Sequence, residues 1–216
     1  MRLPTILSAA ILLIAIVTCR GCAVVAFTVA AFAPPQVKSA AFELPKDKVI
    51  LVFVDDLANP IDYETLKHEL TKGINSRLIK NAEIKKTVRY EDLFRLIASR
   101  PDFNKLSVNQ VAQQLNADVI IYVSIDKFSL GENRKINLWH GKFGTTVRVV
   151  TSSGKQLWPT DLSDGLKMPD VVMPQNVDHS PTYGVTLCSE MAEIMADRIA
   201  KLFYKHTLPR KHLGEK

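Results

Sequence analysis

The chain has 216 residues, of which 47% are hydrophobic and 23% charged, and its mean hydropathy of +0.04 is close to zero. This length and composition are typical of a protein with one buried core, and they exclude an intrinsically disordered chain, a collagen and a polytopic membrane protein. The net charge of +6 is not accompanied by aromatic side chains along a basic stripe, so we expect no nucleic-acid partner.

The N-terminal segment has the layout of a secretory signal peptide. Arg2 precedes an apolar run from Leu3 to Val17, and the small residue Gly21 precedes Cys22. Arg20 interrupts the apolar sequence, and an arginine at the centre of a spanning helix costs about 2.5–3.5 kcal/mol on insertion scales. One continuous span over residues 3–33 is therefore disfavoured, and we predict a signal peptide over 1–21.

The residues around the predicted cleavage point, Cys19-Arg-Gly-Cys22, resemble the lipobox of bacterial lipoproteins. Gly21 fits because the protease pocket before the cut tolerates almost no side chain, whereas Cys19 and Arg20 depart from the usual aliphatic and small residues. The resemblance implies that Cys22 is lipidated and anchors the chain to a membrane, with roughly 0.8 kcal/mol for each buried methylene. An uncleaved leader that spans the membrane once is the alternative.

The spacing Cys19-x-x-Cys22 also occurs in redox and zinc sites. A redox motif opens a helix beside a strand, whereas this pair ends an apolar leader. Half a zinc site needs a second pair of ligands, and the remaining cysteine is Cys188. We therefore expect no metal and no cofactor, and three cysteines do not support a disulfide framework.

Four regions follow from the composition along the chain. After the signal peptide, residues 22–46 are predicted to form an apolar membrane-proximal segment and a tether, in which Pro34 and Pro35 favour extended structure. Residues 47–206 are predicted to form a single α/β domain, and 207–216 a basic flexible tail.

The first half of the domain alternates buried strands with helices. The β-branched runs predict strands over 48–54 and 119–128, whereas apolar residues every three or four positions predict helices. The helices are expected from a cap at Asp62 to Leu78, over 90–99, and from a capping box at Ser107 and Gln110 to Leu115.

The second half is predicted to be a hairpin followed by a helix. Residues 138–151 alternate as in a half-buried strand, Ser152-Ser-Gly154 turns the chain, and 155–158 returns it. The proline-containing segment 160–183 is expected to be irregular, with an edge strand at 171–173. A helix over 183–205 follows, with Cys188 on its buried face. The fold class is α/β (α+β), with a mixed sheet of about four to five strands and helices packed on it.

This order of elements resembles a family of bacterial envelope domains. The entry Ala-Asp-Val-Ile-Ile-Tyr-Val at 117–123 and the hairpin with Ser-Gly-Lys-Gln-Leu-Trp at 153–158 are similar to the periplasmic domains of the lipoproteins CsgG and LpoB and of the N-terminal part of TolB. The leader and tether also resemble uncharacterised lipoproteins of planctomycete-type bacteria. The resemblance implies a non-catalytic protein that binds other envelope proteins.

Two neighbouring carboxylates are the candidate ligand-binding residues. Asp55 and Asp56 follow the first buried strand, and open α/β sheets place ligand groups at the carboxyl ends of strands. Asp126 and Asp118 are expected near them if the two buried strands are neighbours. The alternative is that Asp55 and Asp56 begin a polar turn. The chain has no nucleotide-binding, zinc-protease or serine-hydrolase motif.

The sequence thus predicts a lipid-anchored lipoprotein of the cell envelope that faces the periplasm and has a scaffold, assembly or activator role. Ala23 is not the acidic residue linked to inner-membrane retention, which favours the outer membrane. The exposed sheet edge and the segment 160–183 are the expected contact surfaces. The alternatives are a cation-dependent hydrolase or ligand-binding protein that uses Asp55, Asp56 and Asp126, and a single-span membrane protein with the same domain.

Overall fold

The computed structural model describes residues 36–56, 61, 63–133, 138–177 and 183–208. The predicted leader with Cys22, the cap at Asp62 and most of the basic tail lie outside these residues. The chain forms two units, one of Ser39–His206 and one of Met1–Lys38 with Thr207–Lys216. Among the described helices, none is long and apolar enough to cross a membrane.

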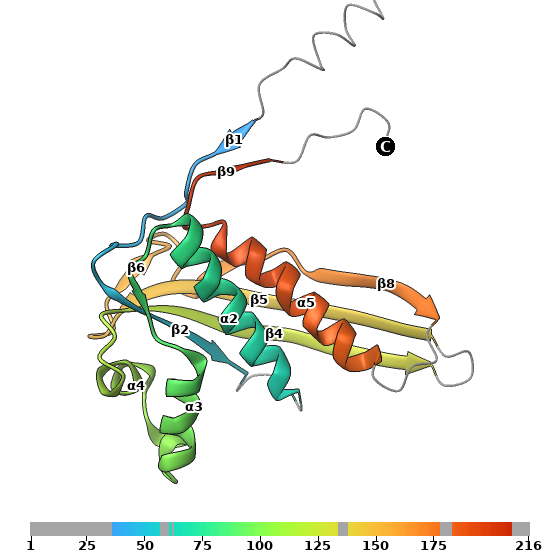
Figure 1. The fold of residues 1–216 in the computed structure, drawn as a ribbon, viewed down its shortest axis with the longest axis horizontal. Coiled ribbons are helices and arrows are strands. Elements are labelled where there is room, and N and C mark those ends of the chain that lie inside the picture. Colours follow the sequence, from blue (N-terminus) through green and yellow to red (C-terminus); the bar gives the residue numbers. More distant parts are fainter. Residues whose placement is uncertain (1–35, 57–60, 62, 134–137, 178–182, 209–216) are drawn as a thin grey trace, which may run out of the picture. The chain divides into compact units, whose positions relative to one another are not determined.

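The larger unit is built on a mixed sheet of seven described strands, in which β3, β2, β4, β5 and β6 are successive neighbours and β7 and β8 also pair with β5 (Figure 1). The strands are β2 (Val49–Asp55), β3 (Lys86–Thr87), β4 (Val119–Asn133), β5 (Leu138–Thr151), β6 (Gln156–Trp158), β7 (Leu166–Lys167) and β8 (Val171–Val177). The helices are α2 (Glu64–Asn81), α3 (Tyr90–Ser99), the short 3-10 helix η1 (Phe103–Lys105), α4 (Val108–Gln114) and α5 (Tyr183–Ala200).

The sheet changes from parallel to antiparallel at β4. β2 pairs with β4 in parallel from Ile50 opposite Val119 to Asp55 opposite Ser124, which requires the long crossover through α2, α3 and α4. β4 then pairs antiparallel with β5 along a long hairpin whose register shifts between Ile125 and Lys127. This shift is a β-bulge, in which β4 contains one extra residue, Asp126, without a register partner in β5.

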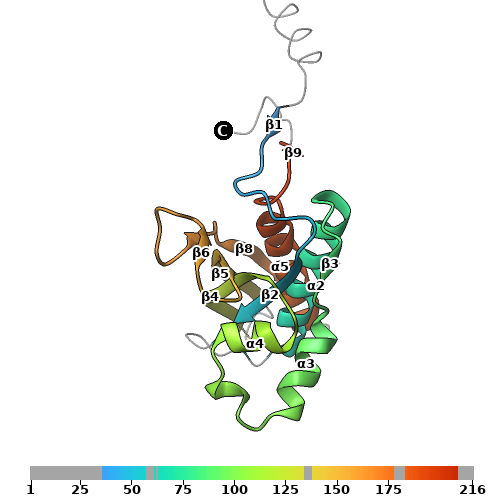
Figure 2. The same cartoon turned by 90° about the vertical axis from the view of Figure 1, so that its left-hand side faces the viewer.

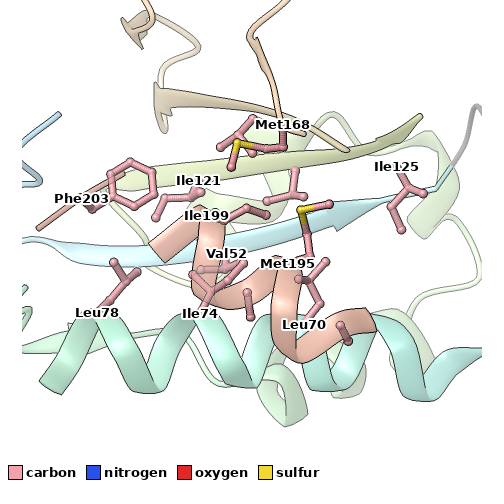
Figure 3. Close-up of a cluster of buried hydrophobic side chains, with 14 of the residues drawn as sticks. Val52, Leu70, Ile74, Leu78, Ile121, Ile125, Met168, Met195, Ile199 and Phe203 are labelled. Atoms are coloured by element: carbon pink, nitrogen blue, oxygen red, sulfur yellow. The ribbon is translucent and has the colours of Figure 1, made fainter. Parts of the chain in front are cut away.

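The first core lies between the sheet and the helices α2 and α5, as Figure 3 shows. Val52, Ile121 and Ile125 point from the strands toward Leu70 and Ile74 of α2, and each of these five side chains is fully buried. Each fully buried aliphatic side chain contributes about 1.5–3 kcal/mol to the free energy of unfolding. More hydrophobic side chains are buried on this face than on the opposite one.

Helices α2 and α5 approach closely at one glycine. A Cβ atom at Gly73 would lie 2.8 Å from the Cβ of Ala196, so a larger residue at this position would force the helices apart. Next to this point the Arg77 guanidinium makes an ion pair with Glu193 and lies 3.5 Å from the carboxylate of Asp197. The two helices thus cover the sheet as one layer.

The second core lies on the opposite face of β2 and β4, under α3 and α4 (Figure 2). Leu51 and Ile120 point from the sheet toward Leu93 of α3 and Val111 of α4, and all four side chains are buried. The predicted capping box at the start of α4 is present, because the Ser107 hydroxyl accepts from the Gln110 backbone and the Gln110 side chain accepts from the Ser107 backbone. The helices of the crossover thus cover both faces of β2 and β4, with α2 on one face and α3 and α4 on the other.

The predicted fold class is confirmed. The sheet has seven described strands because short strands without their own hydrophobic pattern, such as β3 and β7, join the predicted ones. Cys188 is fully buried, as predicted. Helix α5 ends at Ala200 rather than at residue 205, and a turn that begins at Lys201 buries Phe203 instead.

Both connections of this unit lie at the same end of the fold. The compact unit starts at Ser39, before residue 47 where the sequence predicts the domain to begin. The backbone N–H groups of Ala41 and Phe42 donate to the Leu202 carbonyl just after α5, and Leu44 is 5% exposed. In the other unit, β1 (Val37–Lys38) pairs with β9 (His206–Thr207).

Candidate functional site

A cavity of about 500 Å³ opens where β2 ends, between α3 and the sheet. Its walls come from β2, the first half of α2, α3, the segment 103–108 and the facing strands β4 and β5. It is lined by Phe53, Val54, Asp55, Asp56, Lys67, Thr71, Tyr90, Leu93, Phe94, Ile97, Phe103, Asn104, Leu106, Ser107, Val108, Tyr122 and Arg148. β2 ends at Asp55 beside the cavity, whereas its parallel neighbour β4 continues past this point to Asn133.

One wall is a stack of aromatic and charged groups. The Tyr122 hydroxyl donates a hydrogen bond to the carboxylate of Asp55, and the guanidinium carbon of Arg148 lies 4.4 Å from the centre of the Tyr122 ring. Phe53 of β2 stacks against Tyr122 of β4, with ring centres 6.0 Å apart. Burial of Tyr122 and its hydrogen bond to Asp55 raise the pKa of the phenol, so this hydroxyl stays a donor.

The second predicted carboxylate is also engaged within the protein. Asp56 accepts from the Lys67 ammonium at 3.3 Å and from the backbone N–H of Ile61 at 3.2 Å. The side chains of Asp56 and Lys67 are 22% and 18% exposed, so water screens this pair only in part. Asp55 and Asp56 thus both line the cavity, and each is held by a different partner.

Asp126 and Asp118 do not line this cavity. Asp126 is the extra residue of the β-bulge in β4, where its exposed carboxylate accepts from the hydroxyl of Thr146 at 2.6 Å. Asp118 precedes β4 and accepts from the backbone of Val49, so it lies at the opposite end of the parallel strands from Asp55. The expected group of Asp55, Asp56 and Asp126 is therefore not assembled as one cluster.

Metal binding finds no further support in the geometry. Within the described residues, no three His, Cys, Asp or Glu side chains come together as a metal ion would need. The arrangement is instead suited to an apolar group in contact with aromatic rings.

The lining of the cavity contains a buried hydroxyl without a hydrogen-bond partner. Thr71 of α2 is 2% exposed, and its Oγ1 is one of two buried side-chain polar atoms in the described part of the chain that make no hydrogen bond. The other is Oδ1 of Asn75, whose amide donates to the Val88 carbonyl at 2.9 Å. An unpaired buried hydroxyl is costly, and a polar group that entered the cavity could pair with it.

The mouth of the cavity is apolar and open. Phe94 and Ile97, one turn apart on α3, are 51% and 39% exposed although they line the cavity. Tyr90 continues this row, with its ring centre 6.3 Å from that of Phe94. Large apolar side chains that cluster at an opening indicate a surface that another molecule covers.

Several of these residues escaped the sequence prediction. Tyr122 and Arg148 come from strands whose pairing depends on the β4–β5 register, in which they are direct partners. The alternation of β5 places Arg148 on the polar face, which is the signal that could have indicated it. Thr71 and Phe94 carry no sequence signal, because only the crossover brings their helices to the end of β2.

Comparisons with known proteins give fold likenesses only. No family model and no curated protein matches the chain. It is similar to the PelC dodecamer from Paraburkholderia phytofirmans, with 13% identity over 79% of this chain and 96% of that chain and a TM-score of 0.39. It is also similar to the lipoprotein GNA1162 from Neisseria meningitidis, with 13% identity, coverages of 69% and 99% and a TM-score of 0.36. A minor lipoprotein from Acinetobacter baumannii is similar with 9% identity over 71% of this chain and 88% of that chain, and with a TM-score of 0.37.

Bacterial lipoproteins are thus among the structures that this fold resembles. At these identities and TM-scores, the likenesses carry no argument about what the chain does. The resemblance to CsgG, LpoB and TolB stays a prediction.

Proposed function

We propose that the chain is a lipid-anchored lipoprotein of the cell envelope whose periplasmic domain binds other proteins and catalyses no reaction. The observation that carries this proposal is the cavity at the end of β2, with an open apolar mouth formed by Phe94 and Ile97. Its two carboxylates are engaged by Tyr122 and Lys67. A hydrolase that used a cation would need these carboxylates as ligands or as a general base.

The chain enters the domain beside Leu202, and β2 then runs toward the cavity. At about 3.3 Å per residue, the end of β2 lies roughly 20 Å from its start. The proposed anchor is a lipid at Cys22, and the outer membrane is favoured because Ala23 is not the acidic residue linked to inner-membrane retention.

The anchor is tested by the intact mass of the protein extracted from its native membrane. We expect a mature chain that starts at residue 22 and carries added acyl mass, and we expect Cys22→Ala to abolish the modification. Cys19→Ala is the matched control and should leave it in place. An unmodified chain of full-length mass would overturn the lipoprotein proposal and favour the single-span alternative.

The binding function is tested by site-specific photocrosslinking in the full-length protein in its native membrane. A photoreactive phenylalanine analogue at position 94 should give a discrete adduct that Ile97→Asp abolishes. Ile79 is the matched control because it is also 51% exposed, but on α2 outside the cavity. Val172, which is 66% exposed, tests the predicted contact segment 160–183. Adducts of equal yield at 94 and 79, or none at 94, would contradict binding at the cavity.

The hydrolase alternative is separated from the binding proposal by Asp56→Asn. This change removes the carboxylate charge but keeps an oxygen that can accept from Ile61. We expect the adduct at position 94 to survive it. Loss of the protein's cellular function in a folded Asp56→Asn variant that still forms the adduct would favour the hydrolase.

A further inference from the structure

The cavity at the end of β2 is large enough to enclose a small molecule between α3 and the sheet. Its volume of about 500 Å³ lies within the range of about 300–1,000 Å³ that is usual for small-molecule sites. Phe94 and Ile97, on which the proposed protein binding depends, form its exposed mouth. A molecule enclosed by the walls of the cavity is a second ligand, additional to the partner protein.

The charged groups of the cavity cancel one another. Among the described residues that line it, two side chains are acidic and two are basic, namely Asp55, Asp56, Lys67 and Arg148. Asp56 accepts from the Lys67 ammonium at 3.3 Å. Asp55 accepts from the Tyr122 hydroxyl, and the Arg148 guanidinium lies over the ring of that tyrosine. A ligand of either charge would meet two groups of its own sign and would be costly to desolvate, so the cavity is suited to an uncharged molecule.

Aromatic rings line the cavity from several elements. Phe53 of β2 and Tyr122 of β4 stack with ring centres 6.0 Å apart, and Tyr90 and Phe94 of α3 stack with ring centres 6.3 Å apart. Phe103 of η1 adds a fifth ring. One stacked pair belongs to the sheet and the other to α3, so a flat ring that enters between them can make offset-stacked or edge-to-face contacts.

The lining also offers one hydrogen-bonding group to a ligand. Thr71 is 2% exposed, and its Oγ1 makes no hydrogen bond within the described part of the chain. A hydroxyl both donates and accepts, so a neutral oxygen or nitrogen group of a ligand can pair with it. This observation is independent of the rings, and it indicates a ligand that is not a pure hydrocarbon.

We infer that the cavity binds an uncharged aromatic small molecule that carries a hydroxyl, carbonyl or amide group. Its ring lies between the Phe53–Tyr122 pair and α3, and its polar group forms a hydrogen bond with Oγ1 of Thr71.

The test is equilibrium dialysis of 2-naphthol against the full-length protein in lipid nanodiscs, with binding to nanodiscs without protein subtracted. Four further probes of similar outline each change one property. Naphthalene lacks the hydroxyl, decahydro-2-naphthol lacks the aromatic rings, 2-naphthoate is an anion and 2-naphthylmethylammonium is a cation. We expect both charged probes to bind at least about ten-fold more weakly than 2-naphthol, because neither finds an excess of the opposite charge.

Variants at two positions identify the groups responsible. Thr71→Val should lower the affinity for 2-naphthol relative to naphthalene about three- to five-fold, as for the loss of one hydrogen bond. Phe53→Leu should lower the affinity for 2-naphthol relative to decahydro-2-naphthol about three-fold, as for the loss of one aromatic contact. Ile79→Ala is the matched control, because Ile79 lies on α2 outside the cavity, and it should change neither ratio. Circular dichroism of each variant verifies that the fold is kept.

Four outcomes would overturn the inference. They are no binding of 2-naphthol beyond that of empty nanodiscs, an unchanged ratio in Thr71→Val, an unchanged ratio in Phe53→Leu, and binding of either charged probe as tight as that of 2-naphthol.

The adduct at position 94 separates this ligand from the proposed partner protein. We expect the adduct to persist with saturating 2-naphthol, because the ligand leaves the mouth exposed. If 2-naphthol abolishes the adduct, a side chain of the partner occupies the cavity, and the inference is wrong while the binding function stands. Absence of the adduct without any probe, with 2-naphthol still bound as expected, would remove the proposed function and leave the ligand site.

Discussion

Replacement of Thr71 by valine tests whether this buried hydroxyl in the cavity lining is unpaired in the free protein. The side chain is 2% exposed and Oγ1 has no hydrogen-bond partner. Valine has nearly the same shape and a similar helix propensity, so Thr71→Val exchanges a hydroxyl for a methyl group at constant packing. At a position where the hydroxyl is bonded, the same exchange would destabilise the fold.

The magnitude follows from the cost of burying a polar group. A buried hydroxyl without a partner costs about 1–3 kcal/mol relative to one in water, and one buried methyl group contributes about 0.8 kcal/mol. We therefore expect Thr71→Val to raise the free energy of unfolding by at least about 1 kcal/mol. For a domain of this size, that change corresponds to a rise of about 2–4 °C in the melting temperature.

Urea unfolding of the wild type, Thr71→Val and Thr71→Ser provides the measurement. Serine keeps the hydroxyl and loses the methyl group, so this control should lower the free energy of unfolding by about 1 kcal/mol. A loss of 1 kcal/mol or more in Thr71→Val would show that the hydroxyl is paired in the native state. That result would refute the reasoning and show that this hydroxyl is not available to a ligand in the cavity.

Three other properties follow from single residues. Burial and the hydrogen bond to Asp55 raise the pKa of Tyr122. Its contribution to stability is therefore complete below the pKa of an unfolded tyrosine, about 10, and is lost as the pH rises above that value. In urea unfolding between about pH 9 and 11, the free energy of unfolding should fall less for Tyr122→Phe than for the wild type. Burial raises the pKa of the Cys188 thiol to about 11. In the native state at about pH 8, this thiol should therefore resist an aromatic disulfide reagent, whereas in urea it should react fully. A fast reaction in the native state would contradict its place in the core. Gly165 has a φ of +105°, and a Cβ atom there would lie 2.9 Å from a backbone oxygen of β5. Gly165→Ala should therefore lower the free energy of unfolding in urea by roughly 1–3 kcal/mol. An unchanged value would show that the turn adapts without strain.

The strands and helices with their own hydrophobic pattern could be predicted from the sequence. The alternation of Phe143, Val147 and Val149 with polar residues gives β5 its bounds, because burial on one face of a sheet imposes a period of two. The capping box at Ser107 identifies the start of α4, since its two hydrogen bonds are made within three residues. Both signals depend on residues that are close in the sequence, so they can be recognised without knowledge of the tertiary contacts.

The parts that depend on contacts between distant segments could not be predicted. Asp126 does not join Asp55 and Asp56 because β4 continues past the end of β2 and pairs there with β5, where Asp126 accepts from Thr146. The pairing of Tyr122 with Arg148 requires the register of the hairpin. A cavity built from six separate segments depends on the crossover and on the β4–β5 pairing, which sequence periodicity does not describe.

The same crossover places the cavity at one end of β2. Parallel pairing of β2 with β4 requires the chain to return to the start of β2, and α3 and α4 make this return on the face that α2 and α5 leave open. The end of β2 therefore receives the cavity, which α3 lines with Phe94 and Ile97. At the start of β2, by contrast, Asp118 accepts a hydrogen bond from the backbone of Val49. Carboxylates at opposite ends of the parallel strands thus have different surroundings, and the crossover rather than the strand sequence decides which of them faces a cavity.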